Sequence, residues 1–186
     1  MKKLLIKILI LIRYDKILNS LIALYEDVKI VRYEQLSKQS IKFVSQGTGG
    51  LTLAGDLSKF SIDSTSHLKS GTFIECSGKV EIGRYFHTGR GLTIFSTNHN
   101  YENAKKIPYD EKSINKPVII KDFVWFGSNV TVVPGVTVGE GVVAGAGSVI
   151  TKDIEDYAIV GGNPAIVIKY RDKNRFNKLK LDKMFH

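Results

Sequence analysis

The sequence predicts a mainly β protein whose short strands wind into a solenoid. The main observation is a spacing of six residues between apolar positions from Val118 to Thr151. One register consists of Ile120, Phe126, Val132, Val138, Ala144 and Ile150, and a second of Val118, Val124, Val130, Val136 and Val142. Neither a helix, with a period of about 3.6, nor an ordinary strand, with a period of about two, produces this spacing. A true internal repeat is therefore indicated.

The residues between the apolar positions explain how such a repeat forms a coil. Val118 and Ile120, like Val124 and Phe126, have the two-residue alternation of a short strand with one face inward. Turn-forming glycines follow, as at Gly127. A short strand and a bend, repeated, wind into a coil, and successive coils pair as parallel strands about 4.8 Å apart. We therefore expect a parallel β-solenoid.

The N-terminal segment, residues 1–40, is a different kind of sequence and is expected to be helical. Apolar residues that include Leu4, Ile8 and Leu11 share one helical face, with lysines around it. The first apolar run is too short to span a bilayer, and it lacks the cleavage site of a signal peptide. Two interpretations remain open. The helix packs on the solenoid end or on a partner subunit, or it lies at a membrane surface.

The solenoid is expected to cover residues 41–169. Its phase is weaker in the first half, where the inward positions are Leu51, Leu57, Leu68, Ile74, Ile82 and Ile94, with Thr88 in step. Between residues 95 and 117 the repeat stops, and this polar segment is expected to be a long loop that leaves the solenoid wall. A loop of this length in a compact domain is usually functional or disordered. The basic tail, residues 170–186, is expected to form a short helix that caps the solenoid end.

Length and composition fit one domain with a packed core. The chain has 186 residues, one cysteine and a formal net charge of +9. The lone Cys76 excludes an internal disulfide and favours a reducing, cytoplasmic compartment, and we expect its thiol to be buried and unreactive. The charge implies attraction to an anionic partner, such as a phosphorylated cofactor, an anionic lipid or nucleic acid. No nucleic-acid-binding motif is present, so we expect no nucleic-acid partner.

Three segments in the last third of the chain, VWFGSN, VTVVPGVTVGEGVVAGAGSVITKDI and VGGNPA, resemble the hexapeptide-repeat acyltransferases. Within that family the resemblance is to the sugar O-acetyltransferases, such as those acting on galactosides, maltose and polysaccharides. It implies a left-handed parallel β-helix with three six-residue sides per coil. It also implies acetyl-CoA as the acyl donor, no required metal, and a homotrimer with active sites between its subunits.

His99, near the start of the 95–117 loop, is the catalytic candidate. A hydroxyl is a poor nucleophile until a base removes its proton, and a positioned histidine suits this near neutral pH. The resemblance implies this role for His99, because the family carries its catalytic histidine at the matching place. The expected reaction is direct transfer, in which backbone N–H groups of the turns hold the oxyanion.

The resemblance also supplies the cofactor-binding candidates. They are Trp125, Ser128, Ala146, Thr151, Lys152 and Lys169. The first three match positions along the pantetheine arm, and the last three match contacts to the adenosine phosphates. This chain departs from the pattern at Ile166, where many relatives carry a second basic residue. That difference weakens the phosphate clamp or moves its task to Arg171.

The acceptor side is less defined by the sequence. His87 in the repeat, and Tyr101 and Glu102 in the loop, are the substrate-binding candidates, and Tyr101 or Glu102 alternatively orients His99. His67 is expected to be structural or exposed, and Phe123 to pack in the solenoid. The identity of the acceptor does not follow from these residues.

These observations predict a cytoplasmic acetyl-CoA-dependent O-acetyltransferase that acts on a saccharide, including the units of a surface polysaccharide. If the N-terminal helix binds lipid, the enzyme works at the inner face of the membrane. An amino-sugar N-acetyltransferase and an antibiotic acetyltransferase are alternatives, and a non-catalytic scaffold is less favoured. A zinc hydratase of the same fold is disfavoured, because its H-x-x-x-x-H pattern is missing.

Overall fold

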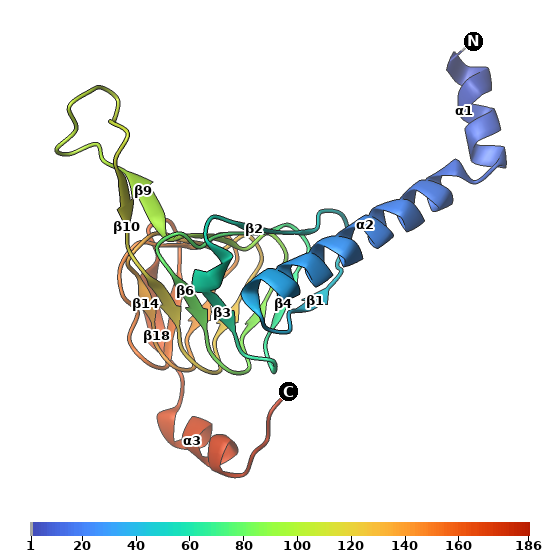
Figure 1. Ribbon diagram of the computed structural model, residues 1–186. Coiled ribbons are helices and arrows are strands. Elements are labelled where there is room, and N and C mark those ends of the chain that lie inside the picture. The colour runs from blue at the N-terminus through green and yellow to red at the C-terminus, as the bar shows by residue number, and fades with distance from the viewer. Residues whose placement is uncertain (1) are drawn as a thin grey trace.

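In a computed structural model that describes residues 2–186, the chain forms a three-sided solenoid (Figure 1). Two helices precede the solenoid, a hairpin leaves one of its edges, and a third helix follows its last strand. Successive strands of the wall belong to three parallel sheets in rotation, which we call faces A, B and C. The corners between them are the AB, BC and CA edges. The parallel-strand architecture expected from the repeat is confirmed.

The strands of each face are as follows. Face A contains β1 (Lys42–Val44), β4 (His67–Lys69), β7 (His87–Thr88), β12 (Trp125–Phe126), β15 (Val143–Ala144) and β17 (Ala158–Gly161). Face B contains β2 (Leu51–Ala54), β5 (Thr72–Glu75), β8 (Thr93–Phe95), β13 (Thr131–Val132) and β16 (Val149–Ile150). Face C contains β3 (Phe60–Ile62), β6 (Val80–Ile82), β11 (Val118–Ile120) and β14 (Thr137–Val138). Outside the wall, β9 (Thr97–His99) pairs with β10 (Ser113–Asn115), and β18 (Ile166–Tyr170) pairs with β17, both in antiparallel fashion.

The core is the inside of the prism, where side chains from successive coils stack on one another. Every residue of both predicted six-residue registers is buried there. Full burial of a Val, Leu, Ile or Phe side chain contributes roughly 1.5–3 kcal/mol, so the stack is the main source of stability. The expectation for Leu57 is met in part, because its half-buried side chain packs against the core. It lies not in a strand but in a short 3-10 helix, η1 (Leu57–Lys59), which Asp56 caps by accepting a hydrogen bond from the Ser58 amide.

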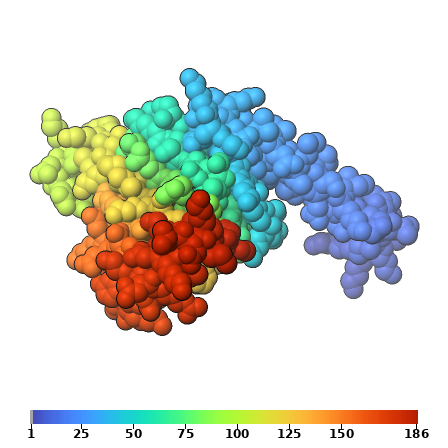
Figure 2. Space-filling view, turned by 90° about the horizontal axis from the view of Figure 1, so that it is seen from below, coloured from blue at the N-terminus to red at the C-terminus, as the bar shows by residue number. Residues whose placement is uncertain are grey.

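Only the end of the N-terminal helical segment is attached to the solenoid. Helices α1 (Lys2–Leu11) and α2 (Tyr14–Ser37) are separated at Arg13, which has a left-handed φ of 54°. After α2, the Gln39 side chain donates to the Phe60 carbonyl (2.6 Å) and accepts from the Ile62 amide (2.9 Å), so it closes the free edge of β3. Most of α2 and all of α1 extend away from the solenoid (Figures 1 and 2). No helix within residues 2–186 has the length and apolarity required to cross a bilayer.

Helix α3 (Lys173–Leu181) docks on the CA edge through one aromatic side chain, Phe176. Along this edge the turn residues Tyr85, Phe123 and Tyr157 have left-handed φ values, and Gly141 occupies the equivalent turn between the last two. A Cβ atom on Gly141 would lie 2.8 Å from the Phe176 ring. The ring of Phe176 therefore fills the gap that the glycine leaves, with Tyr157 at 5.0 Å and Phe123 at 5.9 Å between ring centroids.

Candidate active site

His99 lies in the hairpin that leaves the BC edge between β8 and β11 (Figure 1). The segment expected to be a loop contains a two-stranded ribbon, in which Ser113 lies opposite His99 and Asn115 opposite Thr97. The ribbon stands away from the core, so neither of its faces needs an apolar alternation. This is why the sequence showed no strand pattern there.

One carboxylate organises the outer part of the hairpin. Asp110 accepts hydrogen bonds from the Asn100 side-chain amide (3.0 and 3.1 Å) and from the backbone N–H groups of Lys105 (3.1 Å) and Lys112 (3.0 Å). The two backbone donors hold the pKa of Asp110 below its usual value, because they favour the ionised form. The hairpin is thus an ordered structure that carries His99.

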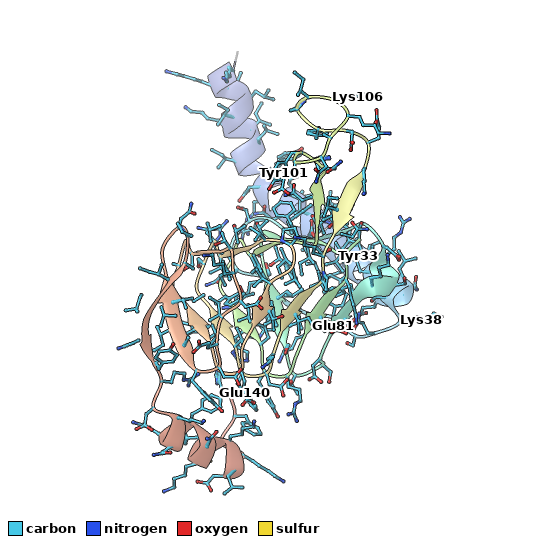
Figure 3. All side chains as sticks on the ribbon, turned by 90° about the vertical axis from the view of Figure 1, so that its left-hand side faces the viewer. Tyr33, Lys38, Glu81, Tyr101, Lys106 and Glu140 are labelled. Atoms are coloured by element: carbon cyan, nitrogen blue, oxygen red, sulfur yellow. The ribbon has the colours of Figure 1, made fainter. Side chains whose placement is uncertain are left out.

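The His99 imidazole is exposed and stacks on the ring of Tyr109, with 3.8 Å between centroids and 11° between planes. It borders a cavity of about 410 Å³ that Tyr101 and Glu102 also line, together with Pro134 from the next coil. Figure 3 shows Tyr101 on the hairpin, on the opposite side of the solenoid from Glu140. Within residues 2–186 neither Tyr101 nor Glu102 hydrogen-bonds the imidazole. Tyr109, which no pattern in the sequence indicated, is the residue that stacks on it.

Two of the cofactor candidates lie on the AB edge. Ser128 and Ala146 occupy equivalent turns of successive coils, and the Gly147 amide donates to the Ser128 carbonyl (2.8 Å). A Cβ atom on Gly127 would lie 2.6 Å from the Ala146 nitrogen, so only glycine permits these turns to stack so closely. The edge therefore presents main-chain groups and small side chains, as a binding groove for an extended arm requires.

The remaining cofactor candidates lie elsewhere. Thr151 and Lys152 follow β16 at the BC edge and share that edge with His99, whereas Lys169 lies on β18 beside Ile159. Arg171, the alternative for the basic residue missing at position 166, lies on a third edge. The Arg171 guanidinium donates to the Gly141 carbonyl (3.2 Å) and lies over the Phe176 ring, on the CA edge.

His87 and Trp125 lie on face A, in one row of outward side chains. The strand register places Lys42 beside His67, His67 beside His87, and His87 beside Trp125. The row borders a second cavity, of about 770 Å³, between face A and the segment from α3 to His186. His87 and Trp125 thus share a cavity with each other and not with Tyr101 or Glu102.

The two neighbouring histidines on face A are poor candidates for a base. Their ring centroids are 4.3 Å apart. Burial and neighbouring positive groups, His87 among them, lower the pKa of His67 to about 4, and burial also lowers the pKa of His87. His67 was expected to be structural or exposed, yet it borders the cavity. No regular spacing in the sequence indicated this, because the steps from His67 to His87 and from His87 to Trp125 are not multiples of six.

The other nucleophile and metal candidates give no alternative site. Cys76 is fully buried, its Sγ–H donates to the Ala54 carbonyl (3.0 Å), and burial raises its pKa to about 11. The expected buried thiol is confirmed. Within residues 2–186, no three His, Cys, Asp or Glu side chains are grouped so as to hold a metal ion.

Comparison with known proteins gives relatives of one kind. A 109-residue stretch is 36% identical to a chloramphenicol acetyltransferase of Klebsiella aerogenes, and the match covers 50% of this chain and 52% of that protein. The chain thus spans about half the length of this relative. No protein-family model matches the sequence.

Two solved structures resemble the chain over most of its length. One is a hexapeptide-repeat acetyltransferase of Vibrio cholerae complexed with acetyl coenzyme A, with a TM-score of 0.62, 22% identity and 75% of both chains covered. The other is a maltose O-acetyltransferase of Clostridium difficile, with a TM-score of 0.52 and 26% identity over 76% of this chain and 73% of that one. The fold of this chain is therefore that of the hexapeptide-repeat acetyltransferases.

Proposed function

We propose that the protein transfers an acetyl group from acetyl-CoA to a saccharide hydroxyl, with His99 as the general base and with the solenoid winding left-handed. The acetyltransferase names of its relatives support the reaction, and the maltose enzyme supports a saccharide acceptor. The free Cys76 and the use of acetyl-CoA favour the cytoplasm as the site of the reaction.

One observation carries the proposal, namely the division of the candidate residues between two edges. His99 and Lys152 lie along the BC edge, whereas Ser128 and Ala146 lie along the AB edge. Face B separates these edges within one copy. In a closed ring, the BC edge of one copy faces the AB edge of the next, and both sets of residues then line one groove. The proposal therefore includes a homotrimer with its sites between subunits.

In this groove the chemistry needs no covalent enzyme intermediate. The His99 imidazole takes the proton of the acceptor hydroxyl while its oxygen attacks the thioester carbonyl carbon. Backbone N–H groups at the turns stabilise the oxyanion of the tetrahedral intermediate. The C–S bond then breaks, and the imidazolium gives its proton to the departing CoA thiolate. The products are the acetyl ester and free CoA, and His99 returns to its neutral form.

Mixing two inactive variants tests two parts of the proposal: that His99 is the general base, and that each active site is shared between two subunits. His99→Ala removes the base from the BC edge, and Trp125→Ala removes a cofactor candidate that adjoins the AB edge. After co-refolding at a 1:1 ratio, roughly a quarter of the interfaces pair two intact edges, because each edge is intact in half of the copies. We expect about that fraction of wild-type activity, measured as CoA thiol release.

A second pair provides the control for this experiment. His99 and Lys152 lie on the same edge, so mixing His99→Ala with Lys152→Gln creates no site with both residues intact. That mixture is expected to stay at the mean activity of its two components. Equal recovery from both mixtures, or a monomer by light scattering, would contradict the shared site.

The match to a chloramphenicol acetyltransferase favours a second candidate, an antibiotic acetyltransferase. The same base and cofactor groove would serve a drug hydroxyl, and an amino sugar would be acetylated at nitrogen by the same steps. A panel of neutral sugars, amino sugars and chloramphenicol, followed by CoA thiol release, separates the three. The saccharide proposal fails if chloramphenicol has the highest kcat/KM.

A further inference from the structure

The cavity on face A has the size of a ligand site. Its volume of about 770 Å³ lies within the range of about 300–1,000 Å³ that is common for small-molecule pockets. Strands β4, β7, β12 and β15 form its floor, and α3 with the residues that follow it forms its wall. One part of the lining is polar, with His67, Lys69 and His87, and another is aromatic.

The charged side chains around this cavity are of one sign. Lys69, Arg171 and Lys180 line it, and no Asp or Glu side chain does within residues 2–186. Lys180 is paired with Glu140. The Arg171 guanidinium has only the Gly141 carbonyl and the Phe176 ring as partners, and Lys69 forms no ion pair or side-chain hydrogen bond within the described residues. Two basic groups are thus left without a counter-charge at a partly desolvated surface.

The aromatic part of the lining is packed and fixed. Tyr85 stacks on Phe123 with 5.2 Å between centroids and 6° between planes, and Phe185 contacts both rings at 4.6 and 5.1 Å. Tyr85 and Phe123 hold left-handed φ values of 54° and 60°. Like Gly141 and Tyr157, they are turn residues at which successive coils bend around the CA edge. The cavity therefore offers a rigid apolar wall beside its cations.

We propose that this cavity binds the acceptor, and that the acceptor is a sugar carried on a phosphate or diphosphate. The proposal rests on the proposed function, since Trp125 in the same cavity is one of the cofactor candidates. An ammonium group, a guanidinium group and two neutral imidazoles match the several oxygens of a phosphate group better than the two of one carboxylate. The aromatic wall packs against the sugar or against an apolar carrier. A nucleotide and a lipid are both possible carriers.

Calorimetric binding to the full chain tests this without any turnover. The probes are uridine diphosphate, farnesyl diphosphate and uridine, all in saturating CoA so that the phosphate contacts of the cofactor are already filled. We expect at least one diphosphate to bind and uridine not to bind. A response to uridine diphosphate alone identifies a nucleotide carrier, and a response to farnesyl diphosphate alone identifies a lipid carrier.

A matched pair of charge variants locates the site. Lys69→Gln is expected to weaken diphosphate binding about tenfold or more, because a hydrogen bond to a charged group is lost. Lys178→Gln removes the same charge from α3 outside the cavity and is expected to change binding less than twofold. The bound diphosphate should also raise the pKa values of His67 and His87 in a proton NMR titration, because an anion favours their charged forms.

Several outcomes would overturn the proposal. Diphosphate binding that CoA abolishes would assign the cavity to the cofactor, and equal effects of Lys69→Gln and Lys178→Gln would place the anion elsewhere. Both results leave the proposed acetyl transfer standing. Tight diphosphate binding without acetylation of any acceptor in the panel would instead contradict the proposed function. The cavity would then remain an anion-binding site.

A different observation carries a second inference, on helix α1. Its large apolar side chains are exposed on almost every side, with Leu5 56%, Ile10 68% and Leu11 82% exposed. No residue of α1 is buried. A helix that is apolar on most sides is normally covered by something.

The charge of this segment indicates what covers it. Residues 2–13 contain four basic side chains, Lys2, Lys3, Lys7 and Arg13, and no acidic one. Copies of the same helix would bring these cations together, whereas an anionic bilayer would pair with them. We infer that α1 lies in the surface of an anionic bilayer, with its apolar side chains among the acyl chains and its lysines at the headgroups.

Vesicle sedimentation of the full chain tests this inference. Binding is expected to vesicles of 25% phosphatidylglycerol in phosphatidylcholine, and to weaken with salt or with phosphatidylcholine alone. Replacing Lys2, Lys3 and Lys7 by Gln is expected to lower the partition coefficient roughly 100-fold, at about 1 kcal/mol per lysine. The control replaces Lys173, Lys178 and Lys183, which carry the same total charge. Equal losses in both variants, or assembly of larger oligomers through α1 with no vesicle binding, would refute it.

Discussion

The hairpin on the BC edge and the cavity on face A each carry histidines, but they hold them differently. The hairpin is kept in shape by backbone hydrogen bonds and by Asp110, and its His99 ring is exposed. The cavity is kept in shape by packed aromatic rings, and its His67 and His87 rings are partly buried beside cations. An exposed imidazole readily exchanges a proton with an acceptor, whereas one with a lowered pKa is a weak base. This difference is the reason why we propose proton transfer at the hairpin and acceptor binding in the cavity.

The largest expected effect separates the two regions directly. His99→Ala should lower kcat by about 10²–10⁴, because a general base is lost. The Tm of this variant should stay nearly unchanged, because the side chain is exposed and lies against the Tyr109 ring. His87→Ala, on face A, should raise KM for the acceptor more than it lowers kcat. Thiol-release kinetics measure both, and a larger kcat loss for His87→Ala than for His99→Ala would exchange the two roles.

The next prediction concerns how the cavity wall is attached. Gly141→Ala should destabilise the protein by about 1–3 kcal/mol, because it combines a left-handed φ with a clash against Phe176. Gly147→Ala is the control, since its φ of +73° is similar and nothing lies within 4 Å of its Cβ position. Urea unfolding of both variants, with limited proteolysis of α3, measures the difference. Equal losses would show that Phe176 does not hold the helix.

A smaller effect is expected in the hairpin itself. Asp110→Asn removes the negative charge that accepts hydrogen bonds from the backbone N–H groups of Lys105 and Lys112. These bonds should weaken, so the outer hairpin should open more often. Turnover should fall about tenfold or less, because His99 is then less well positioned. Hydrogen exchange should increase at these two amides, with the solenoid core unaffected. Unchanged exchange together with reduced turnover would mean that Asp110 acts in another way.

The smallest effect is a dependence of stability on pH. The folded-state pKa of His67, about 4, lies below its unfolded value near 6.5, so the unfolded chain binds more protons between these values. The contribution of the neutral ring is therefore complete above pH 6.5 and is lost as the pH falls towards 4. His67→Asn should show a smaller decrease of Tm over this interval than the wild type. A parallel decrease in both would remove His67 as the cause.

The repeat was predictable because each inward position depends only on its neighbours in the chain. Both registers between Val118 and Ile150 are buried as the spacing required. Prediction failed where the chain leaves that local rule. Leu57 entered η1, and the polar segment around His99 formed a ribbon that needs no apolar side chains.

The candidate site was predictable only as a set of residues. Motifs were enough to name His99, Ser128, Ala146 and Lys152. They did not show on which edge each residue lies, because this depends on the number of residues that separate them around the coil. The steps from His67 to His87 and from His87 to Trp125 are not multiples of six, because insertions lie between them. The row that these residues form on face A was therefore hidden in the sequence.

The amino-acid sequence by itself determined a coil of short parallel strands, because a six-residue period of apolar side chains has no other way to bury them. Tertiary structure decided which residues meet. It set the cofactor candidates Ser128 and Ala146 on a different edge from His99, and it seated Phe176 at Gly141. It also gathered basic side chains around the face A cavity, which no Asp or Glu side chain lines within residues 2–186. The physical reason is that these contacts join residues far apart in the chain, and only the stacking of successive coils fixes their distances.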